Sequence, residues 1–321
     1  MIRALTAAMS GAGTRSRLSV FIFHRVLEAP DPMQPDEPCV ARFATLVGWI
    51  TGQFRVLSPL EACERLTTGR LPTRSAIITF DDGYEDNERI ALPVLQHAGA
   101  DAAFFVATGF LGSGTMFNDR IIEAVRRTSA PSLDASFLGL GTLPAGSMDQ
   151  RRETARRLIG AVKHLPQADR DAACDRIVST AGGGVAPSLM MTVEAVRRLH
   201  RVGMVIGGHT RTHPILRSVD DVVARSQIEG GRDDLRALTG ERPQLFAYPN
   251  GKLGDDFDLR HRDMVAAAGF DFAFTTHPGA GSLGCDPFLL PRFTPWDRDP
   301  LRFGLRAVAN LRRVGSKAGT D

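Results

Sequence analysis

The sequence predicts an α/β fold built from strand and helix units around a parallel sheet. Three segments follow one pattern: a helical stretch, then a glycine, then a short apolar strand. The pattern recurs at residues 85–107, 193–207 and 263–276. Glycine commonly ends a helix, and a short apolar strand is typical of a parallel sheet that is buried on both faces. Functional side chains are therefore expected at the carboxyl ends of the strands.

Length and composition are consistent with one large core. With 321 residues and 43% hydrophobic content, we expect one domain with an insertion. The formal net charge of +3 is small, so nucleic acid is not expected as a partner. No signal-peptide core and no stretch of transmembrane length is recognised, so we expect a cytoplasmic protein. The four widely separated cysteines are expected to be buried thiols: Cys39, Cys63, Cys174 and Cys285.

In chain order, residues 1–17 form an N-terminal segment and residues 18–297 the main domain. The apolar run 18–24 predicts the first strand, and the proline-rich segment 30–38 predicts a loop. The run 76–80 is β-branched and apolar, and it predicts the strand that ends at two carboxylates. The remaining expected helices are 42–54, 59–68, 85–98, 193–202 and 263–268, and the remaining strands are 102–107, 204–207 and 272–276.

The pattern changes between residues 110 and 190. Helical character appears at 117–128, 149–164 and 168–180, whereas 131–146 is small and turn-prone. We predict a largely helical insertion on the catalytic face, with a role in packing alone as the open alternative.

Residues 298–321 form the last predicted segment, a basic helix at about 299–314 followed by a tail. It places Arg298, Arg302 and Arg306 on one stripe. A solvated basic face is the simpler interpretation, and peripheral contact with acidic lipid is the alternative. The oligomeric state is not indicated by the sequence.

Two motifs carry the chemistry. Asp81 and Asp82 follow the strand 76–80, although Asp-Asp-Gly by itself is an ordinary turn. A second apolar run, 205–208, ends in His209-Thr-Arg-Thr-His213. Two imidazoles at this spacing can meet one ion if the backbone makes a single helical turn. One aspartate and two histidines supply three ligands and leave positions for water and substrate, which is typical of a catalytic metal site.

These residues resemble the motifs of the polysaccharide deacetylase family, also called the NodB homology family or carbohydrate esterase family 4. Thr79–Gly83, His209–His213 and Phe246-Ala-Tyr-Pro-Asn-Gly251 stand in the family's order, and the resemblance covers about residues 18–295 with a poorly matching middle. It implies a distorted, incomplete (β/α) barrel that removes N-acetyl groups from amino sugars. Met116-Phe-Asn-Asp119 resembles a segment of exopolysaccharide-linked members that lies near the site.

The resemblance also implies roles for single residues. Asp82, His209 and His213 would hold a divalent metal, usually zinc, with Co²⁺, Mn²⁺ and Ni²⁺ as alternatives. Asp81 would be the general base, and a backbone N–H in the loop at Tyr248 would stabilise the oxyanion. The implied substrate is an N-acetylated amino-sugar oligosaccharide or polysaccharide.

The sequence departs from the family pattern in two places. The arginine expected before the proline-containing loop is absent, because residues 245–247 are Leu-Phe-Ala. Arg292 is therefore our candidate to orient the base. The late Leu-x-His motif is also missing. We expect His24, at the end of the first strand, to be the general acid, with His277 as the alternative.

Other functions fit the sequence less well. A glycoside hydrolase needs two carboxyl groups about 5 Å or more apart, which the adjacent residues Asp81 and Asp82 do not readily provide. An iron oxygenase shares the ligand set, but a β-rich scaffold would be expected for it. A catalytically weak carbohydrate-binding barrel and a deacylase of a non-polymeric or lipid-linked amino sugar remain as alternatives.

Overall fold

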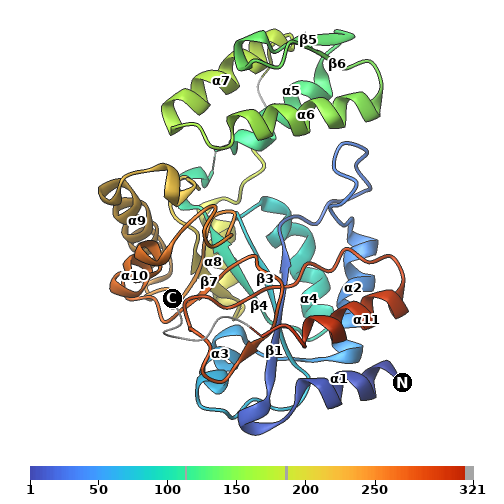
Figure 1. Ribbon diagram of the computed structural model, residues 1–321, viewed down its shortest axis with the longest axis vertical. Coiled ribbons are helices and arrows are strands. Elements are labelled where there is room, and N and C mark those ends of the chain that lie inside the picture. Colours follow the sequence, from blue (N-terminus) through green and yellow to red (C-terminus); the bar gives the residue numbers. More distant parts are fainter. Residues whose placement is uncertain (113, 185–186, 315–321) are drawn as a thin grey trace.

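The computed structural model describes residues 1–112, 114–184 and 187–314 (Figure 1). Its centre is a curled, mixed sheet in which the described residues form eight strands, in the order β10-β1-β3-β4-β7-β8-β9 with β2 paired to β3. Only β10 is antiparallel to its neighbour. The strands are β1 (Arg17–Phe23), β2 (Arg55–Val56), β3 (Ser75–Phe80), β4 (Ala102–Val106), β7 (Val205–Gly208), β8 (Leu245–Ala247), β9 (Phe272–Phe274) and β10 (Gly281–Ser282). This architecture confirms the predicted distorted, incomplete barrel.

Both faces of the sheet are buried, as the apolar strands predict. In β3, Ile78 and Phe80 belong to one apolar cluster, whereas Ile77 belongs to another. The alternation follows from the two-residue period of a strand. Phe80 also stacks on Phe104 of β4, with ring centroids 4.9 Å apart. The centre of the sheet is therefore a packed core, and polar chemistry is left to its carboxyl edge.

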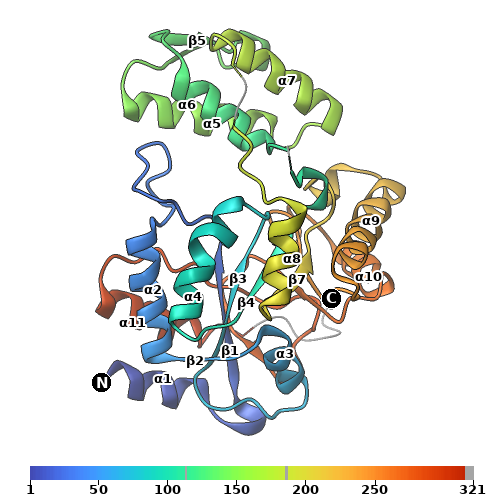
Figure 2. The same cartoon turned by 180° about the vertical axis from the view of Figure 1, so that it is seen from behind.

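Helices cover the sheet, as Figures 1 and 2 show from opposite sides. They are α2 (Val40–Gln53), α3 (Pro59–Thr67), α4 (Leu92–His97), α8 (Val193–Arg201), α9 (Asp221–Thr239) and α10 (Leu259–Ala267), while α1 (Ile2–Ser10) packs on α11 (Pro300–Asn310). The predicted glycines after three of these helices adopt positive φ, as expected: Gly99, Gly203 and Gly269. α10 begins four residues earlier than predicted, and α9 was not predicted at all.

A π-helical stretch precedes α4 within the predicted helix 85–98. It spans Asn87–Ala91, and the N–H of Leu92 donates to the carbonyl of Asn87, five residues back. Pro93 follows, and its missing N–H removes a hydrogen bond of the regular helix. Such π-turns are frequent near functional sites. Here the stretch begins beside the two carboxylates.

The predicted helical insertion is present. It comprises α5 (Phe117–Arg127), α6 (Met148–Val162) and α7 (Gln167–Thr180), with a hairpin of β5 (Ser132–Asp134) and β6 (Thr142–Pro144). These elements share an apolar cluster of their own, to which the proline-rich loop adds Met33. Both views show the insertion at one end of the molecule, beyond the sheet.

A short segment joins the two sides of the curled sheet near its carboxyl edge. Leu290 forms a parallel bridge with Phe274 of β9, and Phe293 forms one with Phe21 of β1. Residues 290–293 thus lie between strands that are far apart in the sheet order. Arg292 belongs to this segment, and its backbone is therefore fixed from both sides.

The C-terminal helix α11 ends earlier than the predicted residue 314. Arg306 pairs with the buried Asp297, whereas Arg302 remains largely exposed. Nothing in the structure tests the alternative of lipid contact, which stays a prediction. Across the described ranges, no helix combines the length and the apolar character that crossing a bilayer requires.

Candidate metal centre

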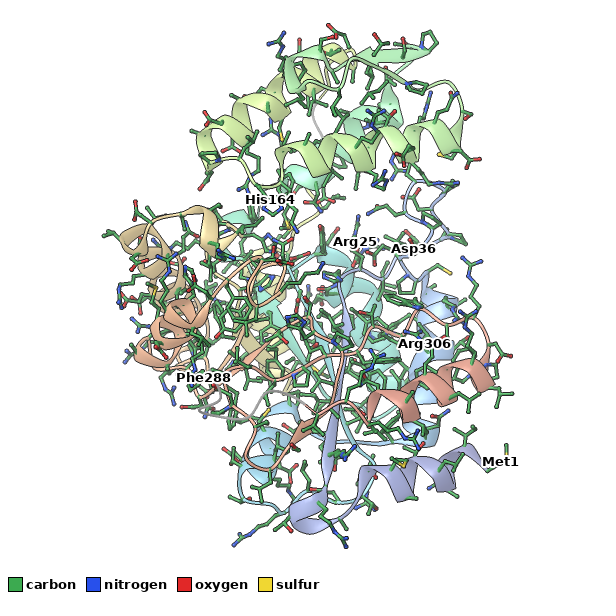
Figure 3. The ribbon with its side chains drawn as sticks, viewed as in Figure 1. Met1, Arg25, Asp36, His164, Phe288 and Arg306 are labelled. Carbon is green, nitrogen blue, oxygen red and sulfur yellow. The ribbon has the colours of Figure 1, made fainter. Side chains whose placement is uncertain are left out.

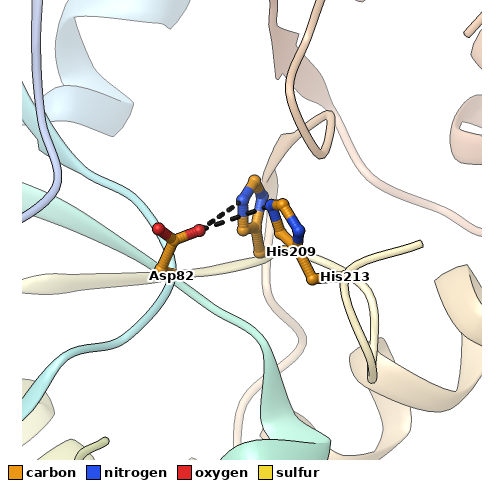
Figure 4. Close-up of side chains that lie close together, drawn as sticks. All are labelled: Asp82, His209 and His213. Atoms are coloured by element: carbon orange, nitrogen blue, oxygen red, sulfur yellow. Dashed lines mark ion pairs between the residues drawn. The ribbon is translucent and has the colours of Figure 1, made fainter. Parts of the chain in front are cut away.

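The structure brings the three predicted ligands together at the carboxyl edge of the sheet (Figure 4). Asp82 follows β3, and both histidines follow β7. One carboxylate oxygen of Asp82, Oδ1, lies 3.3 Å from Nε2 of His209 and 3.4 Å from Nε2 of His213. The three ligand atoms lie within 4.8 Å of one another, and all three residues are buried. One small cation can therefore contact all three.

The backbone reaches this geometry differently from the prediction. Residues 209–213 bend and do not form a helical turn, because Thr210 and His213 adopt left-handed φ values of 63° and 51°. Asp82 is also left-handed, with φ of 77°. The bend is stabilised by the N–H of His213, which donates to Oγ1 of Thr210 at 3.1 Å. Left-handed backbone at non-glycine residues is strained and is concentrated at functional sites.

The donor set fits a cation on chemical grounds. Nδ1 of His209 lies 2.7 Å from the carbonyl oxygen of Ala247, so this nitrogen is the donor of the neutral ring. Nε2 then presents a lone pair toward a carboxylate oxygen. Two acceptors that face each other in a buried site need a proton or a metal ion between them. The three side chains therefore form a candidate site for a divalent metal.

Two of the three ligands, Asp82 and His213, favour the protonation state that a metal needs. For His209, burial lowers the pKa, but Asp82 and Asp81 outweigh burial and raise it, so this ring would release a proton when a cation binds. Burial opposes ionisation of Asp82, but the neighbouring His209 and His213 lower its pKa. Burial lowers the pKa of His213 to about 4, and the nearby His209 adds to that effect, so this ring is neutral near pH 7. An ionised carboxylate beside a neutral imidazole is the protonation state that metal binding requires.

Arg292 holds Asp81 with two hydrogen bonds. Nη1 and Nη2 of the guanidinium donate to the two carboxylate oxygens at 2.6 and 2.7 Å, and both residues are buried. Nε of the same arginine donates to the carbonyl of Thr275 at 2.9 Å. Burial raises the pKa of Asp81, but Arg292 and His209 outweigh burial and lower it. Asp81 is thus ionised and fixed in orientation beside the candidate metal site.

His24 follows β1 at the point where Asp81 follows β3: Phe23 pairs with Phe80, and the N–H of Asp81 donates to the carbonyl of Phe23 at 3.0 Å. The start of the helix after β3 holds its backbone in place. Nδ2 of Asn87 donates to the carbonyl of His24 at 2.8 Å. Oδ1 of Asp86 accepts from the N–H of Val26 at 3.0 Å. Sequence patterns do not show these contacts, because they join segments about 60 residues apart.

His277 is placed less suitably for proton transfer. It is exposed, and its Nε2 accepts a hydrogen bond from the N–H of Leu253 at 3.1 Å. That nitrogen is therefore engaged with the backbone of a neighbouring loop.

The backbone of Tyr248 takes part in the pairing of the sheet. Its N–H donates to the carbonyl of Phe274 at 3.2 Å, because residue 248 continues the pairing of β8 with β9. The N–H of Tyr248 is therefore engaged by the sheet, and the oxyanion role of a backbone N–H in the loop at Tyr248 stays a prediction. The Tyr248 ring is buried and stacks on Phe257, with centroids 3.7 Å apart.

Sequence reasoning missed a polar connection between the site and the insertion. The hydroxyl of Tyr84, two residues after Asp82, donates to Oδ2 of Asp119 in α5 at 3.0 Å. The guanidinium of Arg25 lies over the Tyr84 ring, 4.7 Å from its centroid, and pairs with Asp86 at 2.8 Å. The resemblance of residues 116–119 to a family segment near the site indicated that this region matters, but it did not predict that Asp119 contacts Tyr84.

Comparisons with known proteins agree with this fold and site. Residues 68–133 and 170–273, more than half of the chain, match the family described as Polysaccharide deacetylase. YxkH of Bacillus subtilis (strain 168), whose name also places it among the polysaccharide deacetylases, is 29% identical over 99 residues. That match covers 30% of this chain and 34% of YxkH, so the chain spans about a third of the length of this curated relative.

Solved structures share the fold at low sequence identity. Streptococcus pyogenes deacetylase PplD has a TM-score of 0.60 at 17% identity, with 91% of this chain and 98% of PplD covered. IcaB from Ammonifex degensii has a TM-score of 0.59 at 20% identity, with 94% and 98% covered. A de-N-acetylase from Aggregatibacter actinomycetemcomitans has a TM-score of 0.54 at 15% identity, with 87% and 94% covered. By its fold, its motifs and the match over more than half of its length, the chain belongs to the polysaccharide deacetylase family.

Proposed function

We propose that this protein is a metal-dependent hydrolase that removes N-acetyl groups from amino sugars of an oligosaccharide or polysaccharide. One observation carries the proposal: the buried set of Asp82, His209 and His213 lies beside Asp81, which Arg292 holds in a fixed orientation. Family membership supports deacetylation of a polysaccharide, and the name of one structural relative, a de-N-acetylase, supports an N-acetyl group as the group removed. Zinc is the metal we expect, with Co²⁺, Mn²⁺ or Ni²⁺ as alternatives.

The three ligands would hold the ion, and the remaining residues would move protons. When bound, a divalent cation supplies Lewis-acid chemistry, which activates water and polarises a carbonyl oxygen. Asp81 is ionised and accepts the proton of the attacking water as general base. Arg292 fixes the direction in which the carboxylate presents its oxygens. Nε2 of His209 and Nε2 of His213 both face Oδ1 of Asp82, and these three atoms would hold the ion.

His24 is the proposed general acid, which donates a proton to the leaving amine. It follows β1 at the point where Asp81 follows β3, and Asn87 holds its backbone. Histidine suits this role, because its ordinary pKa lies near neutral pH. The engagement of His277 with Leu253 favours His24 over that alternative.

The proposal is tested by acetate release from a panel of N-acetylated oligosaccharides, with Zn, Co and Mn added to chelated protein. We expect metal-dependent release, which Asp81→Asn with the same metal should lower by about 10²–10⁴-fold. Oligosaccharide binding without acetate release under every condition would favour the carbohydrate-binding alternative. Release only from monomeric or lipid-linked acetamido sugars would favour the non-polymeric alternative.

The role of His24 has its own test. His24→Ala should retain metal and lose most turnover of acetamides, about 10²–10⁴-fold. The loss should be smaller on an aryl acetate, whose leaving group needs no proton. His277→Ala is the matched variant, and we expect a smaller effect from it. Unchanged acetamide turnover in His24→Ala would move the role to His277.

A further inference from the structure

The turn between α6 and α7 of the insertion lies against two loops at the carboxyl edge of the sheet. One is the histidine loop, residues 209–213, in which Oγ1 of Thr212 donates to Oε1 of Gln167 at 3.3 Å. The other follows β8, and its buried Asp256 has Oδ1 3.5 Å from Nζ of Lys163. Figure 3 shows His164, between α6 and α7, on this side of the insertion. The start of α7 is therefore held beside the candidate metal centre.

Arg170 stands on the same face of α7 as Gln167, because residues three positions apart on a helix are neighbours. Further along this face, Cys174 and Ile177 belong to the apolar cluster of the insertion. Arg170 itself is buried, with 5% of its surface exposed. Burial is the main cause that lowers the pKa of His213, and the charge of Arg170 is one of the smaller contributions to that shift. Arg170 thus lies where the inner face of α7 passes from the apolar cluster to the histidine loop.

The guanidinium of Arg170 is a buried donor that lacks an acceptor. Its Nε has no hydrogen-bond partner within the part of the chain that the structure describes. Burial lowers the pKa of Arg170, and Asp171 opposes this only in part, through its charge and without a hydrogen bond. The guanidinium lies over the Phe117 ring, 4.8 Å from its centroid. That contact uses the flat face of the guanidinium and leaves the N–H groups in its plane unengaged. A buried charged donor without an acceptor is costly, unless a ligand supplies the acceptor.

Other arginines of the insertion have the acceptors that Arg170 lacks. Arg126 donates to both carboxylate oxygens of Asp31, at 2.7 and 2.5 Å. Arg151 donates to three backbone carbonyls, at 2.9, 2.7 and 2.9 Å. Both side chains hold parts of the chain together through these bonds. The missing acceptor at Nε of Arg170 is therefore a feature of its place beside the histidine loop, and not of the insertion as a whole.

We propose that Arg170 is a substrate-binding residue, which donates hydrogen bonds to oxygen atoms of the amino sugar whose acetamide lies at the metal centre. The hydroxyl and ring oxygens of a sugar are the acceptors that this guanidinium lacks. The proposal rests on the proposed function, and it gives the insertion a part in recognising the sugar. Arg170 takes no part in the proton transfers assigned to Asp81 and His24, so its loss should affect binding more than the chemical step.

Steady-state kinetics of Arg170→Met test the proposal, because methionine fills similar space and has no donor. The substrates are β-1,4- and β-1,6-linked trimers of N-acetylglucosamine, compared with an aryl acetate that carries no sugar. We expect KM for the better trimer to rise at least about 10-fold, with a smaller change in kcat. The effect on the aryl acetate should be much smaller. An equal loss on both kinds of substrate would overturn the proposal, since Arg170 would then act through the histidine loop. Unchanged KM for both trimers would overturn it as well.

Stability and a matched variant separate binding from folding. Replacing an unpaired buried charge by an apolar side chain is often neutral or stabilising. Arg170→Met should therefore keep its metal content, and its midpoint of urea denaturation should stay the same or rise. Arg176→Met is the matched control, because Arg176 stands on the same helix and lies over the Phe137 ring at 4.2 Å. An equal rise of KM in Arg176→Met, or a lower midpoint with unchanged KM in Arg170→Met, would overturn the assignment.

Binding without turnover distinguishes failure of this proposal from failure of the proposed function. Calorimetry with the two trimers compares Asp81→Asn with the double variant that also carries Arg170→Met. We expect binding at least about 10-fold weaker in the double variant. That result without acetate release by the wild-type protein would overturn the deacetylase and leave Arg170 as a sugar-binding residue. Acetate release by the wild type, with equal binding in the two variants, would overturn the role of Arg170 alone. The proposal for Arg170 is also overturned if Asp81→Asn binds neither trimer.

Discussion

The sheet and the insertion hold their functional residues in different ways. Every residue of the candidate centre comes from a strand end or from the 290–293 segment that bridges β9 and β1. The insertion instead has an apolar cluster of its own and reaches the site with single polar side chains. The family match reflects the same division, because it leaves out residues 134–169 within the insertion. The sheet thus positions the candidate ligands, whereas the insertion contacts the loops in which they stand.

The contacts between the two regions are specific. Tyr84 binds Asp119, and Oγ1 of Thr212 donates to Oε1 of Gln167 at 3.3 Å. Tyr84 lies two residues after Asp82, and Thr212 lies between the two histidines. These contacts join the insertion to the loops of the candidate centre, and the choice between a role on the catalytic face and a role in packing alone stays open to the tests below. The following predictions separate what each region contributes.

Loss of a ligand should have the largest effect. His209→Ala removes one of three donors, so we expect loss of bound metal and of measurable turnover, with most of the fold retained. Retention is expected because the ligands stand on a core that is packed without the ion. Metal content by elemental analysis and circular dichroism check both parts. Complete unfolding of the variant, or of chelated wild type, would show that the metal holds the sheet together.

Asp81→Asn should keep the metal and lose turnover by about 10²–10⁴-fold. The amide retains the shape of the side chain but accepts a proton poorly. Metal content and acetate release are measured on the same preparation, with His209→Ala as the comparison. Equal metal loss in the two variants would mean that the roles of Asp81 and Asp82 are wrongly assigned.

Arg292→Gln should lower turnover by about 10–100-fold, because Asp81 would lose its orientation. It should also lower the free energy of unfolding by about 3–5 kcal/mol, since a buried carboxylate loses its partner. Urea denaturation and acetate release measure the two effects. The double variant Arg292→Gln with Asp81→Asn should regain stability, because no charge is then left unpaired. If the double variant does not regain stability, Arg292 stabilises the fold through a contact other than the one with Asp81.

The strand ends could be predicted from sequence because apolar runs end abruptly at the polar residues that matter. The run 76–80 ends at Asp81, and the run 205–208 ends at His209. The contact of Arg292 with Asp81 could be proposed only through the family resemblance, since 211 positions separate the two residues. The hydrogen bond from the N–H of Tyr248 to the carbonyl of Phe274 is a contact that the motif by itself does not show. A motif identifies a residue, but strand pairing decides whether its backbone is free.

Helix α9 shows a different limit. Its interior contains Gly230 and Gly231, which weaken a helical pattern in sequence. In the structure these glycines permit close packing, because a Cβ at Gly231 would lie 3.0 Å from the backbone of Thr210. One at Gly230 would lie 2.7 Å from the side chain of Arg211. Gly230 and Gly231 weaken the helical pattern of the sequence. In the folded chain, the same two glycines let α9 pack closely against Thr210 and Arg211, which lie between the two histidine ligands.

The smallest expected effect concerns the contact between the two regions and depends on pH. Burial raises the pKa of Asp119 to about 7, although Arg25 and the hydroxyl of Tyr84 oppose the rise. The ordinary pKa of an aspartate is about 3.9, so the folded state binds the proton more tightly than the unfolded state. Protonation of Asp119 therefore stabilises the folded state. This contribution to the free energy of unfolding is complete below about pH 4 and is lost as the pH rises through 7.

Asp119→Asn mimics the protonated carboxyl group and removes this pH dependence. Wild type should therefore lose about 2–3 kcal/mol of unfolding free energy relative to the variant between pH 5 and pH 8. Urea denaturation of both proteins at four pH values measures the difference between their free energies of unfolding. The metal ligands titrate in both proteins, so their contribution to this difference largely cancels. Asp175→Asn, an exposed carboxylate on α7, is the matched control and should show no such trend. Turnover of Asp119→Asn should fall less than 10-fold, because Asp119 reaches the site only through Tyr84. If the difference in the free energy of unfolding does not change with pH, Asp119 is ionised throughout this range. If turnover falls more than about 10-fold, Asp119 belongs to the residues that contact substrate.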